Sequence, residues 1–106
     1  MGKYLFEAQY TTEGAKGVAK EGGSARRAAV EKSFASIGGR LETFYFAFGG
    51  SDAFVIADLP DNVSAAAMAL AVNQSGMATT KTVVLLTPEE MDAAGKKSVS
   101  YRPPGR

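Results

Sequence analysis

The feature that most constrains the fold is a very short connection between two strand-like segments. Residues 40–48 contain three phenylalanines and a tyrosine, residues 52–59 read Asp-Ala-Phe-Val-Ile-Ala-Asp-Leu, and only Gly-Gly-Ser at 49–51 separates them. Aromatic and β-branched residues are typical of β-strands. A connection this short cannot hold a crossover, so the two strands are predicted to pair antiparallel as a tight hairpin.

Two further strand-like segments stand outside the hairpin. Residues 4–10 are rich in aromatic and apolar side chains, and residues 80–86 contain the run Val-Val-Leu-Leu. Runs of this length and composition predict a first and a fourth strand. Each is separated from the hairpin by a helical pattern.

The first helical pattern covers residues 24–37, in which Val30, Phe34 and Ile37 follow the i, i+4, i+7 spacing of one buried face. A weaker helical turn or two at residues 15–21 precedes it, and a Gly-Gly pair separates the two. The second helical pattern follows a Pro-Asp-Asn stop. Its predicted buried face repeats at i, i+3, i+4, i+7 and i+8 and consists of Val63, Ala66, Ala67, Leu70 and Ala71.

The C-terminal part begins with the sharpest local signal in the chain. Thr87-Pro88-Glu89-Glu90 combines a Thr cap, Pro at the first helical position and Glu at the third, and it predicts a short helix to about Ala94. Residues 96–106 have little to bury and are predicted to form a flexible basic tail after a domain of residues 1–95.

The resulting order is β-α-β-β-α-β plus a terminal helix, which predicts an α+β, ferredoxin-like fold with a four-stranded antiparallel sheet. Both crossover helices then cover one face of this sheet. The strands are apolar on alternate residues of both faces, so the other face needs cover as well. We therefore expect a homodimer with two sheets packed face to face, with higher oligomers left open.

Composition removes several kinds of chemistry. The chain has no His and no Cys, which excludes His/Cys zinc sites, thiolate nucleophiles, Ser-His-Asp triads and His-ligated haem. No acidic cluster with EF-hand spacing is present, so no metal and no cofactor are predicted. A net charge of +1 predicts neither nucleic-acid nor membrane binding. Glu7 and Gln9 interrupt any apolar export signal, which makes a cytoplasmic location the expectation.

The net charge combines two parts of the chain that carry charges of opposite sign. The predicted tail holds four basic residues and no acid, whereas eight basic against eleven acidic residues leave the preceding domain at −3.

Side-chain alternation points to a candidate site. On the first strand Tyr4, Phe6 and Ala8 share one face, while Glu7 and Gln9 share the other. Glu7 and Gln9 would then point into the space between the two sheets, where a carboxylate and an amide need partners or water. A polar cleft with Glu7 as general base and Gln9 as a ligand contact is one hypothesis. The alternative is a wet rim of the barrel, or an inverted assignment of the faces.

Three more residues are candidates. Asp52 follows the Gly-Gly-Ser turn, where Asp commonly bonds backbone N–H groups, and its functional alternative is a polar group at the cleft mouth. Tyr45 would orient a ligand carbonyl, or belong to the core or the dimer interface. Lys81 would pair with Glu7 or bind an anionic ligand, the alternative being an exposed edge lysine.

A weaker pattern lies between the helical segments. Gly22-Gly23-Ser24 followed by Arg26 and Arg27 would suit an anion at a helix N-terminus, but the spacing is not that of a P-loop or a dinucleotide fingerprint. A surface kink with an N-cap is the favoured interpretation.

The chain also resembles a known family. Residues 4–14, the Phe-Tyr-Phe strand at 41–48, the turn at 49–52 and the Leu-Pro-Asp entry into an alanine-rich helix together resemble the GYD domain family over residues 4–91. Gly49 and Asp52 match the family's glycine and aspartate, whereas Ser51 stands where its tyrosine would be. The resemblance implies the dimeric α+β barrel superfamily, whose members include haem-degrading and cofactor-free quinol monooxygenases, small isomerases and ligand binders.

The leading functional hypothesis is a homodimeric α+β barrel that binds a small, partly apolar organic ligand in the cleft between its sheets. One alternative is a cofactor-independent monooxygenase or isomerase in which Glu7 or Asp52 acts as base and Tyr45 orients the substrate. A third is a structural or partner-binding module whose basic tail docks on an acidic surface.

Overall fold

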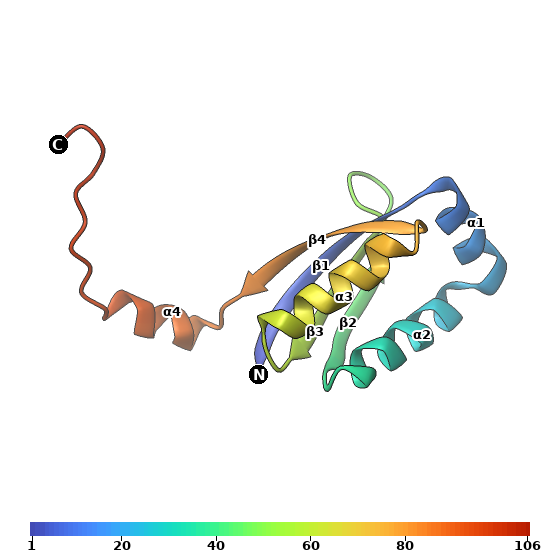
Figure 1. Cartoon of the computed structure of the whole chain (residues 1–106), viewed down its shortest axis with the longest axis horizontal. Coiled ribbons are helices and arrows are strands. Elements are labelled where there is room, and N and C mark those ends of the chain that lie inside the picture. The colour runs from blue at the N-terminus through green and yellow to red at the C-terminus, as the bar shows by residue number, and fades with distance from the viewer.

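A four-stranded antiparallel sheet with the order β2-β3-β1-β4 forms the centre of the molecule, and the helices α2 and α3 cover one of its faces (Figure 1). The computed structural model describes all residues 1–106. This is the predicted ferredoxin-like fold. The elements are β1 Gly2–Tyr10, α1 Thr12–Glu21, α2 Gly23–Ser36, β2 Arg40–Phe46, β3 Ala53–Leu59, α3 Asn62–Gln74, β4 Ala78–Leu85 and α4 Pro88–Gly95.

The central strands β1 and β3 divide their side chains between the two faces of the sheet. We call the face under the helices the helix face; it carries the buried residues of both strands. On the opposite face, Leu5 pairs with Ile56 and Glu7 pairs with Phe54. We call this second side the open face, because no element of the chain covers it. The buried residues of the helix face include Tyr4, Phe6, Val55, Ala57 and Leu59.

The core is centred on Phe34, which is 1% exposed and packs against Phe6 with ring centroids 5.4 Å apart. Val30 and Ile37 pack against the same cluster, so the predicted buried face of the first long helix is confirmed. The Tyr4 hydroxyl donates to Asn62 Oδ1 at 2.6 Å and ties β1 to the first turn of α3.

The first crossover consists of two helices that meet at Gly22, whose φ of 93° lies in the left-handed region. Thr11 caps α1 by accepting from the Gly14 N–H. Gly14 then passes so close to β4 that an added Cβ would stand 1.8 Å from the Met77 carbonyl oxygen. Only glycine permits this approach of backbone to backbone.

The hairpin connection is wider than predicted. β2 ends at Phe46, and the loop closes with the Ala47 N–H donating to the Asp52 carbonyl at 2.8 Å. Phe48 is fully exposed on this loop instead of lying in the strand. The prediction of a tight three-residue turn was therefore wrong, because aromatic composition alone does not show where strand pairing stops.

The predicted buried face of α3 was also wrong. Val63 is 77% exposed and Leu70 is 61% exposed, whereas Ala65 is buried and Met68 packs against the core. The reason is composition: α3 is rich in alanine on every side, so the apolar pattern does not select one face of the helix.

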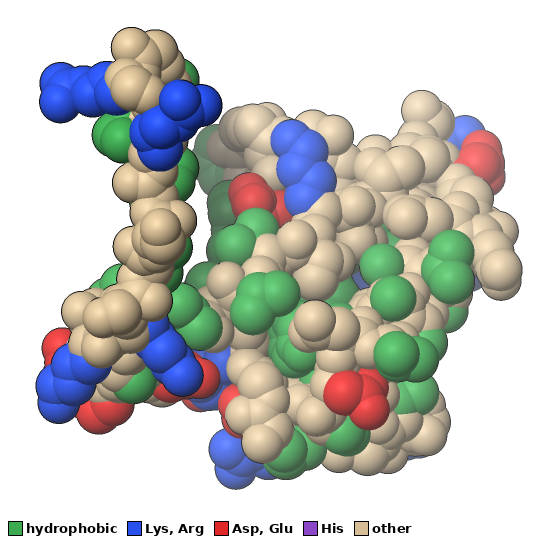
Figure 2. Space-filling view, turned by 60° about the vertical axis from the view of Figure 1, so that its left-hand side comes forward, with side chains coloured by type: hydrophobic (Ala, Val, Ile, Leu, Met, Phe, Trp, Pro, Cys, Tyr) green, Lys and Arg blue, Asp and Glu red, His purple; other side chains and the backbone are tan.

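The C-terminal arm, residues 86–106, projects from the body of the molecule (Figure 1). Its helix α4 begins with the predicted capping box, in which Thr87 and Glu90 each accept from the other's backbone N–H. The residues after Gly95 contain no further helix or strand. Figure 2 shows this arm beside the body, with basic side chains at its end. No helix of the molecule has the length and apolar character that a bilayer crossing requires.

Candidate functional site

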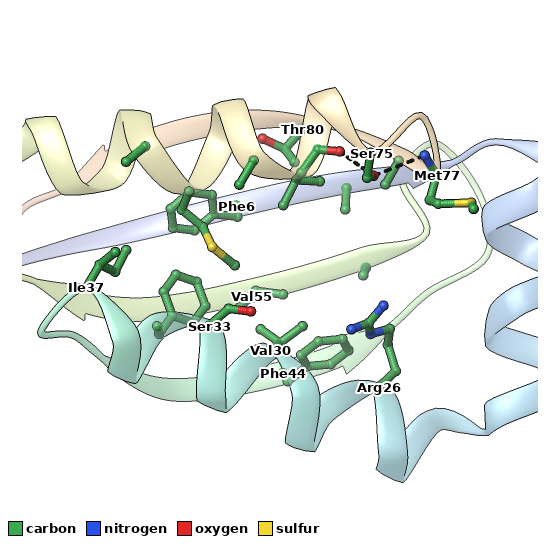
Figure 3. A pocket seen from close by; sticks show the side chains of 18 of the residues that line it. Phe6, Arg26, Val30, Ser33, Ile37, Phe44, Val55, Ser75, Met77 and Thr80 are labelled. Carbon is green, nitrogen blue, oxygen red and sulfur yellow. Dashed lines mark hydrogen bonds between the residues drawn. The ribbon is translucent and has the colours of Figure 1, made fainter.

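A cavity of about 420 Å³ lies between α2, α3 and the helix face of the sheet (Figure 3). Fifteen of its twenty lining residues are hydrophobic. Cavities of this size and character are typical of small-molecule sites. We call it the interhelical cavity.

The interhelical cavity exists because small side chains stand where a filled core has larger ones. Ala8, Ala53 and Ala78 line it from the strands, and Ala67 and Ala71 line it from α3. In addition, α2 lies mainly against β2 and α3 mainly against β4, so the two helices leave the middle of the sheet between them. Protein interiors are normally close-packed, so a space of this size beside a buried core is a feature that needs an explanation.

Two polar atoms in the wall of the cavity are buried without a hydrogen-bond partner. They are Arg26 Nε, from the first turn of α2, and Thr80 Oγ1, from β4. Buried polar groups are usually satisfied, and leaving one unpaired costs about 1–3 kcal/mol. Both side chains belong to the lining of the same cavity.

Arg26 lies where the interhelical cavity meets a second hollow beside α1. Tyr10, Met77 and Arg26 line both spaces. Arg26 Nε is 3.5 Å from Glu21 Oε2, an ion pair without hydrogen-bond geometry. Burial raises the pKa of the Tyr10 phenol, and the charge of Arg26 opposes that rise. The phenol is therefore protonated at neutral pH and is available as a donor.

The opposite side of the sheet carries three of the five residues predicted from sequence. Tyr45 pairs with Phe54, Phe54 with Glu7, and Glu7 with Lys81, so these four residues form one row across the open face. Tyr45 is 70% exposed and Lys81 is exposed. Glu7 is partly buried, and no hydrogen bond or ion pair of its side chain is formed within the chain. The strand register, and not alternation along β1 alone, brings Glu7, Tyr45 and Lys81 to one face.

The other two predicted residues hold the β2–β3 loop instead. Asp52 Oδ2 accepts from the Tyr10 N–H at 2.8 Å, and the Asp52 N–H donates to the Ala8 carbonyl at 2.8 Å. The Gln9 side-chain amide donates to the Gly50 carbonyl. Asp52 therefore has the backbone-bonding role that Asp commonly takes in turns.

One end of the open face carries a small ion-pair network. Lys3 pairs with Glu42 and, at 2.9 Å, with Asp58, which also pairs with Arg40 at 3.2 Å. The hydrogen bond from Lys3, together with the one from Arg40, holds the pKa of the Asp58 carboxyl below its usual range, although partial burial opposes this. These charges give the open face a polar border around Leu5 and Ile56.

No group of three or more His, Cys, Asp or Glu side chains is placed to hold a metal ion. The acidic residues lie apart on the surface or in the ion pairs described above.

A model of the GYD domain family matches residues 4–94. The chain belongs to the GYD domain family. This confirms the resemblance seen in the sequence. No curated protein and no solved structure matches the chain.

Sequence reasoning missed the interhelical cavity and with it Arg26, Tyr10 and Thr80 as site residues. One signal was present: alanine recurs on the helix-facing positions Ala8 and Ala53 of the two central strands. Small residues at such positions predict free volume only once the positions of the helices are known.

Proposed function

We propose that this GYD domain binds a small, partly apolar organic molecule in the interhelical cavity. The observation that carries the proposal is a cavity of about 420 Å³, mostly hydrophobic, with two unpartnered buried polar atoms in its wall. This is the usual composition of ligand sites, an apolar lining with a few polar groups that orient the ligand.

The proposed location differs from the cleft between two sheets that the sequence suggested. The cleft between sheets requires a second chain, and it stays a prediction. The interhelical cavity is formed within one chain, from α2, α3 and the helix face. Ligand binding as proposed here therefore does not depend on dimerisation.

Dimerisation through the open face is a separate part of the proposal. Tyr45, Phe54 and Val83 are 70%, 38% and 41% exposed on that face, and no element of the chain covers them. A contiguous apolar surface of this kind is uncommon on a monomer. A second copy that packs its own sheet on this face would bury these side chains, with the ion-pair network at one border.

A neutral fluorescent dye tests the ligand site directly. N-phenyl-1-naphthylamine brightens when it enters an apolar cavity, and we expect it to bind to the purified protein with one site per chain. Ala67→Phe places a ring in the cavity and should abolish the signal. Ala66→Phe is the matched control, because Ala66 is the exposed neighbour on α3 that does not line the cavity. Equal dye binding by both variants would overturn the proposal.

A second candidate function is a cofactor-independent monooxygenase or isomerase that uses the open face. The observation that favours it is the row of Glu7, Phe54 and Tyr45, which places a carboxylate without an ion partner next to one aromatic side chain and in line with a second. In a dimer this carboxylate would lie in the inter-sheet space as a general base, and Tyr45 would orient the substrate. Glu7→Gln should then remove turnover while the melting temperature stays unchanged. Unchanged turnover excludes Glu7 from such a mechanism.

A further inference from the structure

We infer that the interhelical cavity takes an amphipathic carboxylic acid, whose carboxylate pairs with Arg26 and whose hydrocarbon part lies along α2, and that Glu21 is the counter-ion which the ligand displaces. This inference rests on the proposed function and specifies the chemical class of the ligand. It starts from charge: Arg26 is the only charged residue among the twenty that line the cavity.

The apolar part of the site has a direction. Arg26 stands at one end of the labelled side chains of α2, and Ile37 stands at the other, with Val30 between them (Figure 3). At about 1.5 Å per residue this separation corresponds to roughly 16 Å along the helix axis. An elongated hydrocarbon chain or an aryl group with its acid at the Arg26 end fits this arrangement.

The charged end is suited to a single carboxylate. The guanidinium group offers a planar fork of donors that matches a carboxylate, and its Nε is buried without a hydrogen bond. No lysine and no second arginine line the cavity, which favours a monoanion over a phosphate dianion. The unpartnered Thr80 hydroxyl and the protonated Tyr10 phenol add neutral polar groups to the wall.

The present partner of Arg26 is easily replaced. The Arg26 and Glu21 side chains are 35% and 38% exposed, and their closest contact is 3.5 Å. An ion pair with this exposure contributes little, because water screens it. A ligand carboxylate that enters from the cavity would give the buried Arg26 Nε the hydrogen bond that Glu21 does not give it, and the exchange is therefore favourable.

The test compares an acid with an uncharged molecule of the same length. Decanoate and decan-1-ol are each used to displace N-phenyl-1-naphthylamine from the wild-type protein at pH 7.5. We expect decanoate to displace the dye at a concentration roughly ten- to a hundredfold lower in the wild type than in Arg26→Gln, the loss typical of a charge-assisted hydrogen bond. Decan-1-ol should act equally on both proteins.

Two further variants check the role of the counter-ion. Glu21→Gln should strengthen decanoate binding by roughly two- to fivefold, since the competing exposed pair is removed. Arg27→Gln is the matched control, because Arg27 pairs with Glu31 at 3.6 Å and does not line the cavity. It should leave the displacement by decanoate unchanged.

Methionine methyl NMR locates the bound acid without any variant. Met68 and Met77 line the cavity, whereas Met91 lies on α4. Decanoate should shift the methyl signals of Met68 and Met77 and leave that of Met91 in place.

The possible results distinguish a failure of the carboxylic-acid inference from a failure of the proposed ligand cavity. If the dye binds but decanoate is no better than decan-1-ol in the wild type, or if Arg26→Gln changes nothing, the carboxylic-acid inference is overturned and the ligand cavity stands. If the dye does not bind, or if Ala67→Phe leaves its binding intact, the proposed ligand cavity and the carboxylic-acid inference are both overturned. A decanoate shift at Met91 alone also overturns the inference.

Discussion

The two faces of the sheet are formed by the same four strands, but they differ in how they are covered and how well they are packed. On the helix face, Tyr4, Phe6 and Val55 are 3–6% exposed, yet a cavity of about 420 Å³ stays open beside them. On the open face, Tyr45 and Phe54 pair with each other across the sheet and are nevertheless exposed. One face is covered but incompletely filled, and the other is well paired along its strands but uncovered.

This difference shows that the residues that hold the helices on the sheet are not the residues that determine how completely the space beneath the helices is filled. Large side chains such as Phe34 and Phe6 hold the helices on the sheet, whereas alanines at positions 8, 53 and 78 leave the space. On the open face no helix is within reach, so the strands can bury their apolar side chains only against another molecule. The helix face is thus suited to a small molecule and the open face to a second protein surface.

The largest expected effect tests what holds the helix face together. Phe34→Ala should lower the free energy of unfolding by about 3–5 kcal/mol, because it removes a fully buried ring beside an existing cavity. Phe48→Ala is the control, since Phe48 is fully exposed on the β2–β3 loop and should change stability by at most about 0.5 kcal/mol. Urea unfolding followed by circular dichroism measures both. A cost below about 1 kcal/mol for Phe34→Ala would remove this ring from the core.

The second prediction tests the open face. Ile56→Lys places a charge beside Leu5 in the centre of that face, and it should weaken a homodimer at least about a hundredfold, because an unpaired charge is costly to bury. Light scattering after size exclusion should then report a mass near 11.1 kDa for the variant and twice this value for the wild type. Val63→Lys, on the exposed side of α3, should keep the wild-type mass. A monomeric wild type at high concentration would contradict the proposed dimer.

The third prediction concerns the junction of α1 with β4, at the end of the interhelical cavity. Gly14→Ala should destabilise the fold by about 1–3 kcal/mol, because its Cβ would stand 1.8 Å from the Met77 carbonyl oxygen. Gly17→Ala has nothing within 4 Å of the added Cβ and should stabilise α1 by about 1 kcal/mol. Opposite signs in thermal unfolding confirm the close approach, whereas equal effects would contradict it.

Much of the fold followed from the sequence for physical reasons that act locally. The antiparallel pairing of β2 with β3, the capping box at Thr87 and the spacing of Val30, Phe34 and Ile37 each depend on residues close together in the chain. The buried side of α3 did not follow, because Ala65 and Ala66 differ in burial but not in composition. Ala65 and Met68 are the α3 residues that pack with the core, and this orientation of the helix is a tertiary effect.

The candidate sites divide in the same way. Strict alternation along β1 placed Glu7 on the face opposite Tyr4 and Phe6, since side chains on a strand alternate between the two faces of a sheet. The register with β3, β2 and β4, which alternation does not set, brings Tyr45 and Lys81 into the same row. The interhelical cavity depends on the distance between α2 and α3 and on the kink at Gly22 that aims Arg26, and neither is written in a local pattern. In the sequence, Arg26 belonged only to a weak anion pattern at the N-terminus of a predicted helix.

The smallest expected effect tests the charged border of the open face. The hydrogen bond from Lys3 holds the pKa of Asp58 below the value of about 3.9 that an unfolded chain gives it. The folded state thus binds this proton less readily than the unfolded state does, so the Asp58 contribution to stability is present above about pH 4 and is lost as the pH falls through the lower, folded-state pKa.

Asp58→Asn removes this contribution. Its melting temperature should lie slightly below that of the wild type at pH 7, and the gap should narrow as the pH is lowered below about 4. Asp92→Asn, on α4 outside the network, should not show this pattern. If the difference in melting temperature for Asp58→Asn persists in acid, the packing of the Asp58 side chain, and not its charge, stabilises this end of the open face. The open face would then differ from the helix face only in that no helix covers it.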